Sequence, residues 1–145
     1  MRKKIELIFE RRFYLTPKYF DFITAVAKQD EYITVYKFNN IHLIAEKNGF
    51  KQKIHKKNGY IVKNMSHRAG LRKRKHLKNN KTIYFKRHYV DSFCDNLLEI
   101  DEFFCVPQVF IASIKFKTKR DKNKFSSPYF FGKEIVQRRY NANSR

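Results

Sequence analysis

Charged side chains are segregated into blocks along this chain, and that segregation constrains its fold more than any other feature. Residues 1–46 carry eight basic and six acidic side chains, whereas residues 47–90 carry fifteen basic and no acidic ones. Residues 91–114 carry five acids and no base, and residues 115–145 carry ten bases and two acids. An evenly solvated surface would not divide in this way, so we expect the two basic blocks to line one or two faces around a more neutral core.

The balance of these blocks points to a polyanionic partner. The 145 residues carry 33 Lys and Arg against 13 Asp and Glu, a formal net charge of +20. A chain of this length forms one domain or two small lobes, which excludes a large multidomain enzyme. Aromatic residues make up 17% of the chain, enough to build a core. Repulsion among so many like charges destabilises the compact chain unless a polyanion balances them. We therefore expect nucleic acid as the partner.

The same sequence bears on where the protein works. No apolar run reaches the roughly 18 residues that cross a bilayer, and the charged start lacks the features of a secretory or transit signal. Cys94 and Cys105 form neither a disulfide framework nor a metal quartet, which fits a reducing compartment. Lys, Asn, Ile, Phe and Tyr, whose codons are AT-rich, make up 70 of the 145 residues. We therefore expect an organelle-encoded, mitochondrial protein, with the cytoplasm as the alternative.

Local patterns predict an α/β (α+β) protein with two small lobes. Thr16-Pro17 indicates a helix start, Gly49 a helix end, and Asn58-Gly59 a tight hairpin turn. We expect helices over 17–29 and 41–48, a helix or turn over 101–104, and strands over 4–14, 31–36, 50–54, 60–63, 71–77, 82–90, 97–100, 109–116 and 134–137. The predicted division is an extension (1–15), an N-terminal helix-strand-helix-hairpin lobe (16–90), a connector (91–96), a C-terminal, mostly antiparallel β lobe (97–140) and a tail (141–145).

Basic side chains interleaved with aromatic ones supply the candidate RNA contacts. On a strand over residues 82–90, Phe85, Arg87 and Tyr89 would share one face, and such a face suits phosphates and unpaired bases. Residues 115–124 are expected to form a basic loop directly after an apolar strand. The predicted RNA-binding residues form two surfaces: Arg72, Arg74, Lys86 and Arg87 on one, and Lys115, Lys117, Thr118, Lys119 and Arg120 on the other.

Signals for catalysis and for metal binding are weaker. The five histidines, at positions 42, 55, 67, 76 and 88, lack zinc-finger spacing relative to the cysteines. Glu99 and Asp101 would share a strand face, as metal ligands of some nucleases do, but they could equally cap a helix or balance neighbouring arginines. The chain contains no glycine-rich phosphate loop. We therefore predict no catalytic residue, no metal and no cofactor.

The order of elements resembles that of the small-subunit ribosomal protein eight family. The N-terminal likeness consists of a helix, a short β-branched strand and a second helix that ends in Gly49-Phe50. The C-terminal likeness is ungapped and lies in three segments: Phe110-Ile111-Ala112-Ser113-Ile114, Lys115-Phe116-Lys117-Thr118-Lys119 and Gly132-Lys133-Glu134-Ile135. The serine hydroxyls and the glycine of the family's central loop are absent here.

This resemblance implies a structural constituent of the small ribosomal subunit. Such a protein binds the central domain of small-subunit ribosomal RNA, contacts neighbouring ribosomal proteins and supports assembly for translation. It is not an enzyme, and it has no small-molecule substrate, no cofactor and no contact with a membrane.

Two further hypotheses stay open. The first is a metal-dependent nucleic-acid enzyme of an AT-rich viral or organellar genome, either a small nuclease or an RNA triphosphatase of the tunnel type, whose opening strand carries alternating glutamates. Glu6, Glu10, Glu99 and Asp101 would then be metal ligands, although Glu6 and Glu10 are four residues apart. The second is a packaging protein that binds nucleic acid without sequence preference.

Overall fold

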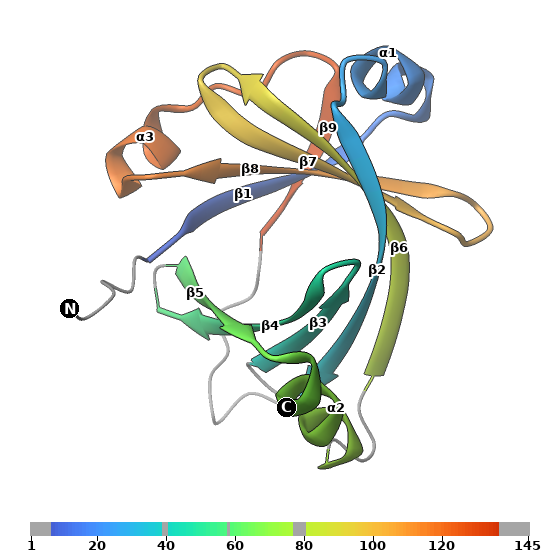
Figure 1. The fold of residues 1–145 in the computed structure, drawn as a ribbon. Helices are drawn as coiled ribbons and strands as arrows, with labels where there is room; N and C mark the ends of the chain where they lie inside the picture. Colours follow the sequence, from blue (N-terminus) through green and yellow to red (C-terminus); the bar gives the residue numbers. More distant parts are fainter. Residues whose placement is uncertain (1–6, 39–40, 58, 77–80, 137–145) are drawn as a thin grey trace.

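One curled antiparallel sheet of nine strands forms almost the whole molecule. The computed structural model describes residues 7–38, 41–57, 59–76 and 81–136. The strands follow one another across the sheet in the order β5-β4-β3-β2-β6-β7-β8-β1-β9. Figure 1 shows the sheet wrapping around a central space, with the short helices on its outside.

The described residues form nine strands and a few short helices. The strands are β1 (Phe9–Leu15), β2 (Gln29–Phe38), β3 (Ile41–Glu46), β4 (Gly49–Lys56), β5 (Gly59–Met65), β6 (Lys81–Phe93), β7 (Asn96–Phe103), β8 (Val109–Phe116) and β9 (Phe131–Ile135). The helices are a 3-10 turn (Pro17–Tyr19), α1 (Phe20–Thr24), α2 (His67–His76) and α3 (Lys119–Lys124).

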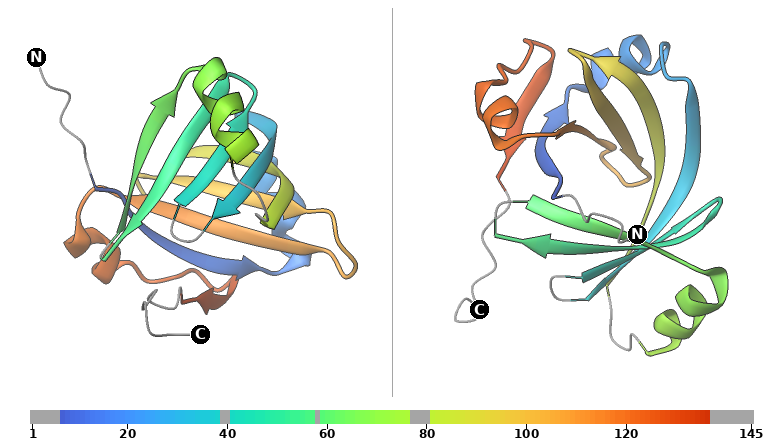
Figure 2. Two further views of the ribbon diagram at one scale, coloured as in Figure 1. Left: turned by 90° about the horizontal axis from the view of Figure 1, so that it is seen from below. Right: turned by 60° about the vertical axis from the view of Figure 1, so that its left-hand side comes forward.

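The curl closes on itself where β5 meets the start of β1, as the two views of Figure 2 show. Ile8 and Tyr60 exchange both backbone hydrogen bonds, at N···O distances of 2.7 and 2.9 Å. Gly59 permits this approach, because a Cβ atom at that position would lie 2.4 Å from the carbonyl oxygen of Ile8. Strands β1 to β8 therefore enclose an interior, and β9 pairs with the far end of β1 outside this closure.

The largest apolar core lies on the convex, outward face of β1, β7 and β8. Successive side chains of a strand point to opposite faces, so alternate residues of these strands build it. Helix α1 and the segment that leads into β9 cover this face. Its most deeply buried members are Phe13, Leu98, Ile100, Ala112 and Ile114, each at most 2% exposed.

Helix α2 covers a second, smaller core on the outside of β3 and β4. Leu43 and Phe50 are its buried members. Gly70 lets the helix approach closely, because a Cβ atom there would lie only 2.1 Å from the ring of Phe50. The N-terminus of α2 is capped by Ser66, whose hydroxyl accepts a hydrogen bond from the Ala69 amide at 3.1 Å.

The prediction of two α/β lobes is wrong. Strands β2 and β6 pair over nine residues, from Gln29 opposite Tyr89 to Lys37 opposite Lys81, and β6 continues into β7 through a tight turn. This continuous pairing joins the predicted N-terminal and C-terminal parts in a single sheet. Helices are short and peripheral, so the helix-strand-helix order on which the ribosomal resemblance depends is absent from the described residues.

Several individual elements also differ from prediction. The segment predicted as a helix over 41–48 is strand β3, and the segment predicted as a strand over 71–77 lies largely in helix α2. The long helix expected over 17–29 shrinks to the 3-10 turn and α1. Residues 101–103 extend strand β7 rather than forming a helix or turn, and the basic segment after β8 contains helix α3.

Other predictions are confirmed. The strands predicted over 31–36, 82–90 and 109–116 lie within β2, β6 and β8, and the basic hairpin of residues 50–63 is formed by β4 and β5. Among the residues that the structure describes, no helix combines the length and apolar character needed to cross a membrane.

Candidate functional site

The interior of the closed sheet holds a charged cavity of about 1300 Å³. On β6, Phe85, Arg87 and Tyr89 share the inward face, as their alternation predicted, and the same period brings polar side chains inward from the neighbouring strands. The cavity is lined from β3 to β8 by Ile44, Glu46, Lys51, Lys53, Tyr60, Val62, Arg87, Tyr89, Leu97, Glu99 and Lys115, and near its opening by residues of the β6–β7 turn and of α3.

Three cationic side chains enter the cavity from three different strands. Lys53 of β4 and Lys115 of β8 lie on the same aromatic ring, with their Nζ atoms 4.0 and 4.9 Å from the ring centroid of Tyr60. Arg87 of β6 makes a two-pronged contact with Asp101, with N···O distances of 2.8 and 3.1 Å. The three cations are therefore fixed in position by neighbouring side chains before any ligand arrives.

The acidic groups of the cavity are shared among these cations. Lys115 donates a hydrogen bond to Glu10, and its Nζ lies 3.3 Å from Oε1 of Glu99. Lys53 lies 3.9 Å from the other Glu10 oxygen. Burial alone would raise the pKa of Glu10, but Lys115 and Lys53 hold that pKa far below its ordinary value. Glu10 is thus a carboxylate throughout the neutral range.

Lys53 has the most unusual proton affinity of the three cations. Burial lowers its pKa to about 8, and the positive charges of Lys115 and Arg87 contribute, against an opposing effect of Glu10. Lys115 behaves oppositely: burial would lower its pKa, but Glu10 and Glu99 raise it well above the ordinary value. An anion placed in this cavity would therefore find Lys115 charged and would favour the charged form of Lys53.

A second group of basic side chains faces the interior from β1 to β4. The rings of His42 and His55 meet edge to face, with centroids 4.6 Å apart. Burial lowers the pKa of His42 to about 3 and that of His55 to about 4, and nearby Lys53, Lys37 and Arg12 add to both shifts. These imidazoles are neutral near pH 7, and the field around them is positive.

The cavity opens to solvent beside helix α3. Cys94, Asp95, Lys117, Asp121 and Lys124 line this opening, and all five side chains are exposed. Lys117 and Lys124 form no ion pair within the described part of the chain. The opening therefore carries two exposed lysines beside two exposed aspartates, Asp95 and Asp121.

The described acidic side chains of the cavity contact cations rather than forming a group of metal ligands. Within residues 7–38, 41–57, 59–76 and 81–136, no group of three or more His, Cys, Asp or Glu side chains is arranged to hold one. Glu10 and Glu99 each contact Lys115, and Asp101 contacts Arg87. A divalent cation would have to displace these cations to reach the carboxylates.

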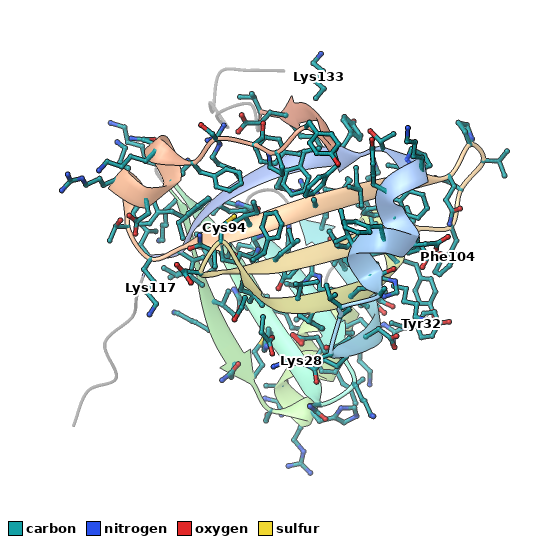
Figure 3. All side chains as sticks on the ribbon, turned by 90° about the horizontal axis from the view of Figure 1, so that it is seen from above. Lys28, Tyr32, Cys94, Phe104, Lys117 and Lys133 are labelled. Atoms are coloured by element: carbon teal, nitrogen blue, oxygen red, sulfur yellow. The ribbon has the colours of Figure 1, made fainter. Side chains whose placement is uncertain are left out.

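The structure separates the predicted RNA-binding residues. Arg87 and Lys115 lie inside the cavity, and Lys117 lies at its opening, where Figure 3 shows it on a different side of the molecule from Lys133. Arg72 and Arg74 lie on the outer helix α2, with Arg74 over the ring of Tyr36. Lys86 points outward from β6, 3.8 Å from Asp30.

The remaining predicted contacts lie on α3. Lys119 and Arg120 are exposed there, and the hydroxyl of Thr118 caps the helix by accepting a hydrogen bond from the Asp121 amide at 3.1 Å. Thr118 therefore has a structural role at a position where we predicted an RNA contact. Contact with nucleic acid through these exposed residues stays a prediction.

Three of the four carboxylates proposed for an enzyme do converge. Glu10, Glu99 and Asp101 all point into the interior from β1 and β7, whereas Glu6 lies outside the described residues. Lys53 was missed by sequence reasoning. The alternation Lys51, Lys53 and His55 along β4 was the signal that could have placed it on the same face as the acids.

Comparisons with known proteins find a likeness only among solved structures. No protein family and no curated protein sequence matches the chain. A crystal structure described as the inorganic triphosphatase NE1496 is similar at 13% identity and a TM-score of 0.47, over 87% of each chain. A second, described as the hypothetical protein NE1496, gives 13% identity and a TM-score of 0.48 over 88% of each chain. A likeness this distant does not establish an activity.

The expectations that came with the ribosomal resemblance are corrected. A structural role in translation, ribosomal RNA and ribosomal proteins as partners, and the absence of enzymatic activity were all implied by an element order that the fold does not have. The described residues form one curled nine-stranded sheet instead. The expectation that there is no small-molecule substrate came with the same resemblance and is corrected with it, and the cavity offers a place for such a substrate.

Proposed function

We propose that this protein binds a terminal triphosphate inside its cavity and hydrolyses a phosphoanhydride bond of that group. The proposal keeps the tunnel-type triphosphatase from the hypotheses left open by the sequence and sets aside the nuclease. The substrate is either a small triphosphate or the 5′-triphosphate end of an RNA, because the chemistry recognised in the cavity is the same.

The observation that carries this proposal is the convergence of Lys53, Arg87 and Lys115 on one enclosed space. They come from three strands, and the side chains of Lys53 and Lys115 are each 16% exposed. Buried cations are costly unless they are paired, and each of these three contacts a carboxylate that it shares with another of them. A triphosphate carries several negative charges in a row, which matches cations that approach from different directions.

The same arrangement suits hydrolysis of the bound group. In phosphoryl transfer the negative charge is spread over the transferred phosphate and the bridging oxygen, so fixed cations around it stabilise the transition state. A water oxygen bonds to the terminal phosphorus, the bridging oxygen leaves with the bonding electrons, and one proton is released. The products are inorganic phosphate and a diphosphate. A magnesium or manganese ion that accompanies the triphosphate enters as part of the substrate.

The test is release of phosphate by the purified protein from three substrates: sodium triphosphate, a nucleoside triphosphate and a 5′-triphosphorylated RNA. Each is assayed with magnesium, with manganese and with EDTA. Phosphate release from the RNA alone would identify the 5′-triphosphate end of RNA as the substrate. Phosphate release from the small compounds alone would identify a small triphosphate as the substrate.

Lys53→Met is the informative variant, because it removes one cavity cation and keeps the length of the side chain. The loss of one charge-assisted contact is expected to lower the affinity for the triphosphate by a factor of roughly ten to a hundred. Lys133→Met is the matched control, since Lys133 is exposed on β9 and Figure 3 shows it pointing away from the sheet. Equal activity of the two variants, or no binding and no phosphate release by the unaltered protein, would contradict the proposal.

A further inference from the structure

Lys115 occupies a special place among the cavity cations, between two carboxylates from neighbouring strands. Strand β8 lies between β1 and β7, and the register places Lys115 directly opposite Glu10 on β1. On the other side β7 brings Glu99 within 3.3 Å of the same ammonium group. Cross-strand pairing therefore makes one lysine bridge two acids.

The two carboxylates are as enclosed as the lysine. Their side chains are 10% and 9% exposed, and Oε1 of Glu99 is buried without a hydrogen bond of good geometry within the described residues. This oxygen has only the longer ionic contacts, 3.3 Å to Lys115 and 3.5 Å to Arg87. A buried, incompletely satisfied carboxylate oxygen marks a position that attracts a cation.

We infer that the ammonium group of Lys115 is a built-in cation, which takes the position between Glu10 and Glu99 that a divalent ion would otherwise occupy. An ammonium group has three hydrogens. One is donated to Glu10, Glu99 makes the longer ionic contact, and Tyr60 lies against the same group, so an anion in the cavity would compete with Glu99 and Tyr60 for the other two. Lys115 is thus a positioning residue that keeps the two carboxylates apart from the phosphates. That the anion is a triphosphate rests on the proposed function. The position of the Lys115 ammonium group between Glu10 and Glu99 is independent of the proposed function.

The inference predicts how divalent cations bind to the protein in the absence of any phosphate. In the unaltered protein Glu10 and Glu99 are already neutralised, so Glu99→Gln is expected to leave a manganese titration unchanged. In Lys115→Met the two carboxylates lose the cation that they share and keep, within the described residues, only the longer contacts of Glu10 with Lys53, at 3.9 Å, and of Glu99 with Arg87, at 3.5 Å. Because the number of charged ligands sets the affinity for such ions, we expect manganese to bind this variant on the order of tenfold more tightly.

The experiment measures free manganese by electron paramagnetic resonance during titration of the unaltered protein, Lys115→Met, and Lys115→Met combined with Glu99→Gln. Lys133→Met serves as the control. The gain in affinity is expected in the single Lys115 variant and is expected to disappear in the double variant. The inference would be overturned if the unaltered protein bound manganese tightly and Glu10→Gln or Glu99→Gln abolished that binding. This comparison does not depend on whether the Lys115 variants fold.

Triphosphate binding in EDTA separates this inference from the proposed function. The built-in cation predicts that the unaltered protein still binds sodium triphosphate in EDTA, with an affinity within roughly tenfold of that in magnesium. Binding that requires magnesium would count against Lys115 as the resident cation. Absence of binding under both conditions would reject the proposed function and leave the manganese titration as the independent test of Lys115.

Discussion

The two faces of the same strands differ in what they bury, although the inward face also carries a small apolar cluster of Ile33, Val35, Ile44 and Phe85. On the outward face of β7, Leu98 and Ile100 are wholly buried in an apolar core. On the inward face, Glu99 and Asp101 are 7% and 2% exposed and lie among cations. A sheet needs only one apolar face to fold, because burial of that face supplies the main driving force. The other face is then available for chemistry, at the cost of burying charged groups that must be paired.

The outward face is expected to be the more sensitive to substitution. Phe13→Ala removes a ring that is 2% exposed and that contacts the rings of Phe125 and Phe131. Large-to-small changes of this kind typically lower the free energy of unfolding by about 3–5 kcal/mol. Urea unfolding followed by circular dichroism measures the change. A loss below about 1 kcal/mol would mean that this core contributes little to stability.

Pairing of charges should govern stability where the charged groups meet on the inward face. Asp101→Asn leaves Arg87 without its two-pronged partner and is expected to lower the free energy of unfolding by about 3 kcal/mol. Arg87→Met together with Asp101→Leu removes both charges and should recover most of that loss, since apolar replacements of a buried pair are often neutral. The same urea titration compares the single and double variants. A double variant as unstable as the single one would show that the inward face is held by packing after all.

The neutral histidines of the inward face predict how stability depends on pH. The pKa of His42 is about 3 in the folded protein, against about 6.5 in an unfolded chain. Between these values the unfolded chain binds a proton that the folded protein does not, so stability falls as pH falls. The slope approaches about 1.4 kcal/mol per pH unit for each such histidine.

His42→Gln should flatten this dependence, and the remaining slope should come from His55, whose pKa of about 4 acts in the same direction. Urea unfolding at several pH values between 7 and 5 measures it, above the range in which most carboxylates titrate. His67→Gln, at an exposed position on α2, is the control. Parallel pH curves for the His42 variant and the unaltered protein would show that the pKa of His42 is the same in the folded and the unfolded protein.

The smallest effect is expected at the edge of the cavity. Thr118→Ala removes the hydroxyl that caps α3 and should cost about 1 kcal/mol of local stability, whereas Thr118→Ser should keep the cap. Amide hydrogen exchange of α3 measures this local change. Equal exchange in both variants would assign the hydroxyl of Thr118 to some other role.

The sequence predicted strands better than it predicted their arrangement. Residues 109–116 were predicted as a strand from their apolar character, but the inward position of Lys115 depends on its register opposite Glu10. Such long-range pairing has no signal in a single sequence. The arginine, lysine and glutamates of the cavity could therefore be singled out in the sequence, but their convergence on one cavity could not be predicted from it.

Two errors had a local physical cause. Gly49 was interpreted as a helix end, but its positive φ of 135° serves the turn between β3 and β4. The inward side chains His42, Ile44 and Glu46 alternate with Leu43 and Ala45 as in a strand, but the inward face mixes apolar and polar residues and so weakens that pattern. For α2, Ser66 provided the capping signal, and the run of basic residues after it obscured the helix.

The backbone bridge between Ile8 and Tyr60 has a consequence for what shapes can be accommodated. Because these two residues complete a ring of hydrogen-bonded strands, a polymer cannot be laid into the interior from the side. A long chain can therefore reach the interior only through an end of the ring, which favours a free terminus over an internal stretch because a terminus enters without bending back on itself.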